Sequence, residues 1–147
     1  RGNRKAIHFP RAMMHSNDYR FSLSGLKTAV ITYIEGEGRA GRAINLPDLA
    51  ASFEAAVIDV QVAKAVAAVE ETGVSDFCIG GGVAANPALR AEYKREFGRR
   101  GVRVTVPPMV VCGDNAAMMA LAALRNWRAG VLSSLTQDAE PNAKLNY

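Results

Sequence analysis

The clearest pattern along the chain is an apolar repeat of three or four residues between positions 49 and 67. Its members are Leu49, Phe53, Val57, Val60, Ala63 and Ala67, and this spacing puts them on one face of an α-helix. Pro47 suits the first turn, Asp48 complements the positive end of the helix dipole, and Gly73 suits the C-terminal end. The pattern predicts a helix over residues 47–71, about 37 Å long.

Two short apolar segments further along predict strands. Residues 77–79 (FCI) are typical of a buried strand and end at three glycines, whereas valines alternate with Arg103 and Thr105 over residues 102–106. Between them, Asn86 and Pro87 fit the N-cap and first position of a helix that stops at Gly101. This order predicts adjacent parallel strands with a right-handed crossover, in an α/β architecture with few strands and much helix.

The N-terminal third carries weaker patterns. Residues 1–20 show no period and predict a loop or arm, and residues 21–24 predict a short strand. The recurrence of Leu26, Val30 and Ile34 predicts a helix. A flexible loop with glycines at positions 36, 38 and 41 is expected after it.

At the C-terminal end, a last helix is expected from Ala116 to about residue 128, and the polar residues from 133 onward predict a loose tail. The expected organisation is an N-terminal arm or inter-lobe segment (1–20), a lobe (21–132) and a polar tail (133–147).

Composition excludes several classes of protein. With 147 residues, 49% hydrophobic and 22% charged, the chain suits one domain with a sizeable core and is not disordered. No apolar run approaches the roughly 20 residues of a membrane span, and no signal-peptide pattern opens the chain. The first residue is Arg1 rather than Met, which fits a piece of something longer.

The net charge of +4 is mildly basic and does not by itself establish nucleic-acid binding. Positive charge is concentrated in residues 1–11 and 90–103. The second run is typical of a solvated helix face, the alternative being a surface that faces phosphates and binds in a salt-dependent way. Cys78 and Cys112 form no CxxC pair, which indicates a reducing cytoplasm, and Cys78 is predicted to be a small core residue.

The glycine turn at residues 80–82 has two interpretations. A strand that runs through glycines into a helix start offers free N–H groups and close backbone approach to an anion. Gly80, Gly82 and Ala85 match the dinucleotide pattern G-x-G-x-x-A loosely, but Val106 and two prolines stand where an acid is needed. The alternative is a tight turn that binds no ligand.

The segment around Asp114 also has two interpretations. Its spacing favours a helix cap, and the functional alternative is a hard oxygen ligand for a metal or a phosphate-bound cation. One carboxylate is not a metal site, and His8 and His15 lack the spacing of a zinc-protease helix. The stripe of Met118, Met119 and Leu121 is predicted to be core.

Five blocks together resemble one family. They are residues 9–11 (FPR), 21–30 (FSLSGLKTAV), 50–53 (AASF), 81–90 (GGVAANPALR) and 114–119 (DNAAMM). In order and spacing they resemble the TsaD family, the tRNA N6-adenosine threonylcarbamoyltransferases formerly labelled O-sialoglycoprotein endopeptidases, and the second block is similar to the bacterial branch. Five blocks in register, over about residues 9 to 130, are far more specific than one glycine loop.

The resemblance implies the C-terminal lobe of an actin-like (ASKHA, ribonuclease H-like) ATPase fold. It implies transfer of threonylcarbamoyl from threonylcarbamoyl-AMP to N6 of the tRNA adenosine 3′ of the anticodon. Asp114 matches the family's aspartate metal ligand, Asn86 matches the asparagine that contacts the substrate nucleotide, and Gly81 and Gly82 would line its phosphate side. Two departures are Gly113, where Thr or Ser is expected, and Leu23, where Phe is common.

The resemblance also implies cofactors and partners. These are one divalent metal per full-length subunit, iron or zinc, and threonylcarbamoyl-AMP or ATP as nucleotide. The remaining metal ligands belong to an H-x-x-x-H motif in an N-terminal half that this sequence lacks, so the chain alone is expected to bind metal weakly and to be inactive. Expected partners are tRNA, the proteins TsaB and TsaE, the missing lobe and, for the isolated chain, further copies of itself. The alternatives are an actin-like nucleotide-binding or interaction module without transferase activity, and a metallopeptidase.

Overall fold

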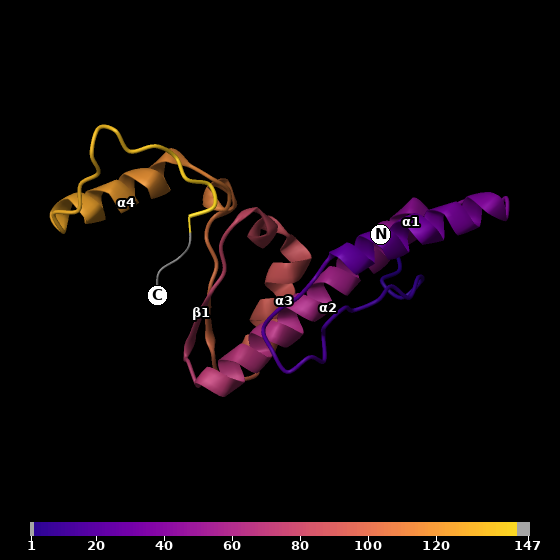
Figure 1. Ribbon diagram of the computed structural model, residues 1–147. Helices are drawn as coiled ribbons and strands as arrows, with labels where there is room; N and C mark the ends of the chain where they lie inside the picture. The colour runs from indigo at the N-terminus through magenta and orange to yellow at the C-terminus, as the bar shows by residue number, and fades with distance from the viewer. Residues whose placement is uncertain (1, 144–147) are drawn as a thin grey trace. The chain divides into compact units, whose positions relative to one another are not determined.

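The longest element is helix α2, Leu46–Thr72, in a computed structural model that describes residues 2–143 (Figure 1). The side chain of Asn45 caps its start by accepting a hydrogen bond from the backbone N–H of Asp48 at 3.2 Å. Pro47 lies in the first turn, and Gly73 ends the helix in the left-handed conformation with φ of 66°. The helix predicted over residues 47–71 is confirmed, with Asn45 as a cap that the sequence pattern did not reveal.

A two-stranded parallel sheet follows α2. Strands β1 (Asp76–Cys78) and β2 (Arg103–Thr105) pair with Phe77 opposite Val104, and helix α3 (Pro87–Gly98) connects them. The predicted strand–helix–strand order and parallel pairing are confirmed. The helix-rich α/β class is confirmed as well, with both strands only three residues long.

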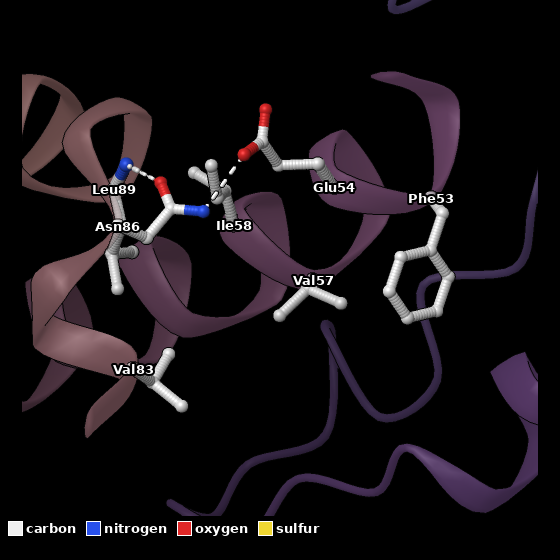
Figure 2. A pocket seen from close by; sticks show the side chains of 7 residues that line it. All are labelled: Phe53, Glu54, Val57, Ile58, Val83, Asn86 and Leu89. Carbon is white, nitrogen blue, oxygen red and sulfur yellow. Dashed lines mark hydrogen bonds between the residues drawn. The ribbon is translucent and has the colours of Figure 1, made fainter. Parts of the chain in front are cut away.

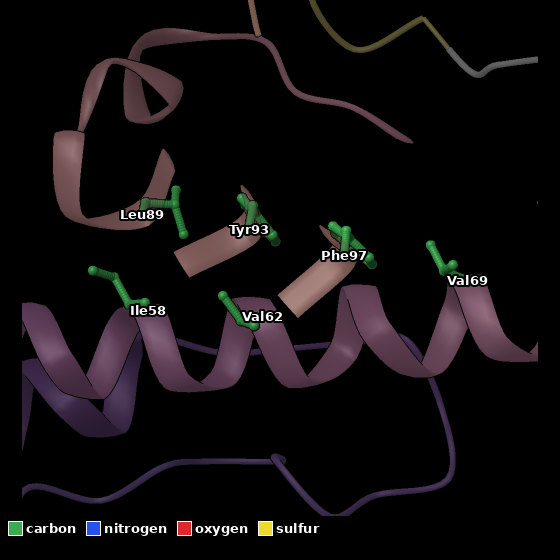
Figure 3. Close-up of a cluster of buried hydrophobic side chains, with 6 residues drawn as sticks. All are labelled: Ile58, Val62, Val69, Leu89, Tyr93 and Phe97. Atoms are coloured by element: carbon green, nitrogen blue, oxygen red, sulfur yellow. The ribbon is translucent and has the colours of Figure 1, made fainter. Parts of the chain in front are cut away.

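The main core lies between α2 and α3 (Figure 3). Its buried members are Ile58, Val62, Val69, Leu89, Tyr93 and Phe97. Phe77 of β1 packs its ring 4.4 Å from the ring of Phe97 and 5.1 Å from that of Tyr93, measured between centroids. The sheet is therefore attached to the helices chiefly through inward-facing side chains of its strands.

The prediction that Cys78 is a core residue is wrong. Side chains alternate between the two faces of a strand, and Phe77 occupies the inward position, so its neighbours Asp76 and Cys78 point outward. Cys78 is exposed, whereas Cys112 is buried. The apolar run of residues 77–79 signalled a strand correctly but gave no information on which face is covered.

Helix α1, Ser24–Arg39, is longer than the predicted segment and corrects two expectations. Residues 21–24 are not a strand: among the described residues no strand pairs with them, and Ser24 begins the helix. Gly36 and Gly38 lie in the last turns of α1 rather than in a loop, a conformation that glycine tolerates at a cost of about 1 kcal/mol each. Of these three glycines, only Gly41 is left-handed, with φ of 65°.

The N-terminal arm, residues 2–20, has no helix or strand, as predicted, but it is tied to α2. A second core cluster of Phe9, Leu26, Leu49 and Ala56 joins the arm to α1 and α2. The backbone N–H of Ile7 donates to Ser52 Oγ at 3.1 Å, and Arg11 donates to the Asp59 carboxylate at 2.8 and 3.1 Å. The arm follows the helix and helps to cover its apolar face.

The chain forms two compact units, a first that ends at Cys112 and a second that begins at Gly113 and contains helix α4, Ala116–Arg128. Asn115 caps α4 by accepting from the backbone N–H of Met118 at 3.0 Å, so the interpretation of Asp114 as the cap is wrong. The two candidates are adjacent in the sequence, and the hydrogen bond to Met118 identifies Asn115 as the cap.

The stripe of Met118, Met119 and Leu121 is exposed, and its prediction as core is wrong for the described structure. No residue of α4 is buried, because α4 is the only described helix of its unit and that unit has no second element to pack against it. Residues 129–143 contain no helix or strand, and the last residues of the predicted tail (144–147) lie outside the described part. No helix within residues 2–143 is long and apolar enough to cross a membrane.

Candidate functional site

The glycine turn after β1 leads into a short 3-10 helix, η1 (Gly82–Ala85), which the sequence did not reveal. Gly81 adopts φ of 81° and ψ of 170°, a region that is essentially restricted to glycine. A Cβ atom at Gly80, Gly81 or Gly82 would meet no heavy atom within 4 Å. Gly81 is therefore required by its backbone conformation, and the exposed turn leaves its main chain open to a ligand.

Asn86 links η1 to α3 and uses both ends of its side-chain amide (Figure 2). Its Oδ1 accepts a hydrogen bond from the backbone N–H of Leu89 at 2.9 Å, which makes it the N-cap of α3 as predicted. Its Nδ2 donates to Glu54 Oε1 on α2 at 2.7 Å. One of the free N–H groups expected at this helix start is thus already bonded within the protein.

A pocket of about 230 Å³ lies between α2 and the η1–α3 junction. Five of its lining residues are apolar and two are polar: Phe53, Val57, Ile58, Val83 and Leu89, with Glu54 and Asn86 (Figure 2). A mostly apolar pocket with a few converging polar groups is the usual form of a small-molecule site. This pocket is formed within one unit of the chain.

Arg90 connects η1 to the end of the first unit. The sequence pattern identified this arginine only as a member of the basic run. Its Nε donates to the carbonyl oxygen of Ala84, and its Nη2 lies 2.7 Å from the sulfur of Cys112. Cys112 is buried and can donate its thiol proton to the carbonyl oxygen of Pro108 at 3.5 Å. The guanidinium therefore links η1, which directly precedes Asn86, to the segment that ends at Cys112.

The other arginines of the basic run are paired with acids. Glu96 accepts from Arg100 at 2.8 Å and lies 2.9 Å from Arg95 and 3.4 Å from Arg99. The hydrogen bond from Arg100 lowers the pKa of Glu96 below its ordinary value, and the charges of the three arginines act in the same direction. The surface carries less unmatched positive charge than the count of arginines suggested.

Asp114 lies in the second unit and is exposed. Among the described residues, no group of three His, Cys, Asp or Glu side chains could hold a metal ion. Gly81, Gly82 and Asn86 thus share one connection of the first unit, whereas Asp114 belongs to the other unit and supplies a single carboxylate.

Comparison with known proteins identifies the family. A sequence model described as TsaD, tRNA N6-adenosine threonylcarbamoyltransferase, matches residues 1–121. The chain belongs to this family. The resemblance inferred from the five sequence blocks is confirmed, and those blocks contain Gly81, Gly82, Asn86 and Asp114.

Curated relatives of this chain come from bacteria and carry the name tRNA N6-adenosine threonylcarbamoyltransferase. The protein of Clostridium botulinum strain 657 is 42% identical over 144 residues, which are 98% of this chain and 42% of the relative. That of Clostridioides difficile strain 630 is 40% identical over 99% of this chain and 43% of the relative. That of Lactobacillus delbrueckii subsp. bulgaricus is 43% identical over 95% of this chain and 41% of the relative. The chain spans less than half the length of these relatives.

Proposed function

We propose that this chain is the C-terminal lobe of a threonylcarbamoyltransferase with an actin-like fold. The whole protein would move the threonylcarbamoyl group from threonylcarbamoyl-AMP to N6 of the tRNA adenosine 3′ of the anticodon. The observation that carries the proposal is membership of the TsaD family over residues 1–121. The open glycine turn that leads directly to a pocket-lining asparagine supports it independently.

In this proposal the first unit supplies the nucleotide contacts. The exposed main chain at Gly81 and Gly82 approaches the phosphate side, where a side chain would obstruct it. Asn86 contacts the nucleotide through the part of its amide that its two protein hydrogen bonds leave available. Holding the carbamoyl donor and the target adenine in one cleft would accelerate transfer by proximity.

The metal implied by the family fits this chain only in part. Asp114 is an exposed oxygen ligand of the kind that a divalent cation such as iron or zinc accepts. The described residues contain no complete ligand set, so we derive no catalytic step through a metal. The proposal assigns Asp114 as one ligand and leaves the others to the part of the relatives that this chain does not span.

The same proposal names the partners and the cellular setting. The nucleotide would be threonylcarbamoyl-AMP or ATP, the macromolecular substrate tRNA, and the protein partners TsaB and TsaE, all in the cytoplasm. Residues 1–20 would then be an N-terminal arm or inter-lobe segment, residues 21–132 the actin-like lobe and residues 133–147 a polar tail.

Substitution of Asp114 in a full-length protein carrying these residues tests the function. Asp114→Ala should abolish threonylcarbamoyladenosine formation on tRNA, measured by nucleoside mass spectrometry, because a metal ligand is lost. Modification that survives would favour an actin-like binding module without transferase activity. Peptide hydrolysis that depends on Asp114 would favour the metallopeptidase alternative.

A second arm tests the chain by itself. Residues 1–147 should show no transfer, because they provide one metal ligand and one side of the cleft. Robust modification of tRNA by this chain alone would contradict the proposed division of the site between two lobes.

A further inference from the structure

The contact between Glu54 and Asn86 joins the middle of α2 to the start of α3 across 32 residues of sequence. Glu54 Oε1 accepts a hydrogen bond from Asn86 Nδ2 at 2.7 Å, and both residues line the pocket (Figure 2). Asn86 is the residue for which the proposed function requires a fixed side chain. Glu54 belongs to none of the blocks that identify the family.

The orientation of the Asn86 amide is determined from two sides. The backbone N–H of Leu89 can only donate, so it requires Oδ1 to face it at 2.9 Å. Oε1 of Glu54 accepts a hydrogen bond, so it requires Nδ2 on its side. Both requirements are met by one orientation, which leaves one N–H of Nδ2 and one lone pair of Oδ1 for a ligand.

Glu54 is well suited to hold a neighbour in place. It is half-buried on α2 and lines the pocket together with apolar side chains that include Val57 and Ile58. None of the ion pairs found within residues 2–143 includes Glu54, so no arginine or lysine there competes for its carboxylate. Hydrogen bonds to a charged acceptor beside apolar walls are stronger than neutral ones in water.

We propose that Glu54 is a positioning residue, which fixes the side-chain amide of Asn86 in the orientation that contacts the nucleotide. Glu54 itself need not touch the ligand. Without it, the capping bond to Leu89 is the one hydrogen bond within residues 2–143 that still holds the side-chain amide, and rotation of the side chain can break that bond. The inference rests on the proposed nucleotide role of Asn86 and extends it to a residue on another helix.

The test measures ATP affinity by calorimetry in a full-length protein carrying these residues. Glu54→Ala should weaken ATP binding about tenfold, the scale expected when a hydrogen bond to a charged group is lost. Glu54→Gln should stay within about threefold of the unmodified protein, because its amide oxygen can still accept from Asn86. If the alanine variant does not fold, Glu54→Met replaces it, since Met keeps the length and helix propensity but supplies no strong acceptor.

A matched control separates positioning from general stability. Asp59 lies on the same helix and pairs with Arg11 of the arm at 2.8 Å, away from the pocket. Asp59→Ala should lower stability without changing ATP affinity. An equal loss of affinity in Asp59→Ala and Glu54→Ala would show that α2 stability is being measured and would overturn the positioning role.

A double-mutant comparison decides whether Glu54 acts through Asn86. The Glu54→Ala/Asn86→Ala protein should bind ATP no more weakly than Asn86→Ala alone. A further additive loss would mean that Glu54 acts independently, which overturns the inference. If Asn86→Ala weakens binding and Glu54→Ala does not, the inference fails and the proposed function stands; if Asn86→Ala has no effect, the proposed role of Asn86 itself fails.

Discussion

Lys64 of α2 donates a hydrogen bond from its Nζ to the backbone carbonyl oxygen of Ser16, 2.7 Å away in the arm. The lysine is only 5% exposed, and its ammonium also donates to Ser16 Oγ and to the carbonyl oxygen of Asp18. A buried ammonium requires such partners, because burial without them is costly. Lys64 and the loop around Ser16 therefore stabilise each other.

Replacement of Lys64 by Met should release this loop. We expect Lys64→Met to lower the free energy of unfolding by about 2 kcal/mol, because charge-assisted hydrogen bonds are lost while the apolar stem is kept. Urea unfolding measures the change, and hydrogen exchange should rise in residues 13–20. Lys94→Met, at an exposed position of α3, is the control and should leave both unchanged; equal exchange in the two variants would contradict the anchoring role.

The carboxyl group of Asp18 should make the stability of the folded protein depend on pH in the acidic range. A hydrogen bond from Arg20, followed by one from Ser16, lowers the pKa of Asp18 from 3.8 to about 2. Because the folded pKa is depressed, its stabilising contribution is complete above 3.8 and is lost as the pH falls toward 2. An NMR titration of the carboxyl carbon should show the low midpoint, and Arg20→Ala should raise it; a midpoint near 3.8 in both proteins would refute this.

The two central glycines of the site should differ in their tolerance of a side chain. Gly81→Ala should destabilise the protein by about 1–3 kcal/mol, because its φ of 81° and ψ of 170° strain any residue with a Cβ. Gly82→Ala is the matched control: it lies in η1, its φ is not positive, and a Cβ there meets nothing within 4 Å. Chemical denaturation of both variants distinguishes backbone strain from lack of space, which would affect both positions.

The arginines of α3 provide a test for tRNA contact. As a hypothesis, Arg95→Glu with Arg99→Glu should weaken tRNA binding and reduce the slope of log affinity against log salt by about one to two, because phosphate contacts are lost. Arg42→Glu, which breaks an exposed ion pair with Glu37, is the control. A slope unchanged by the double reversal would assign the paired arginines to a solvated face.

The exposed stripe of α4 should promote self-association of the isolated chain. Met119 is 63% exposed and Leu121 53% exposed, and apolar patches of this kind favour association. Sedimentation velocity at high concentration should detect species larger than a monomer. Replacing both residues by Lys should reduce them; only monomer in the unmodified chain would contradict the expectation.

The parts of the fold that were predictable depend on local sequence. The start of α3 followed from Asn86 and Pro87, and the end of α2 from Gly73, because caps are formed within a few residues. The sequence blocks were also sufficient to identify the family and to nominate Gly81, Gly82, Asn86 and Asp114 as candidates, whose roles stay predictions.

What could not be predicted depends on contacts between distant segments. The exposure of Cys78 and burial of Cys112 are decided by which face of a strand is covered and by how Arg90 folds back on the turn. The partner of Asn86 lies 32 residues earlier in the chain. The prediction of a strand at residues 21–24 was wrong for a related reason, since a strand forms only if another strand pairs with it.

Helix α2 contributes to both core clusters, Leu49 and Ala56 to one and Ile58, Val62 and Val69 to the other. Each added residue turns the rest of a helix by about 100°. A single insertion between residues 56 and 58 would therefore rotate one core away from its partners while the other remained in place. It would also turn Glu54 away from the face of the helix that carries Ile58. The length of this part of α2 is consequently under tighter physical constraint than the identity of its exposed side chains. Changes in chain length are better accommodated in residues 40–44, between α1 and α2, and after residue 128.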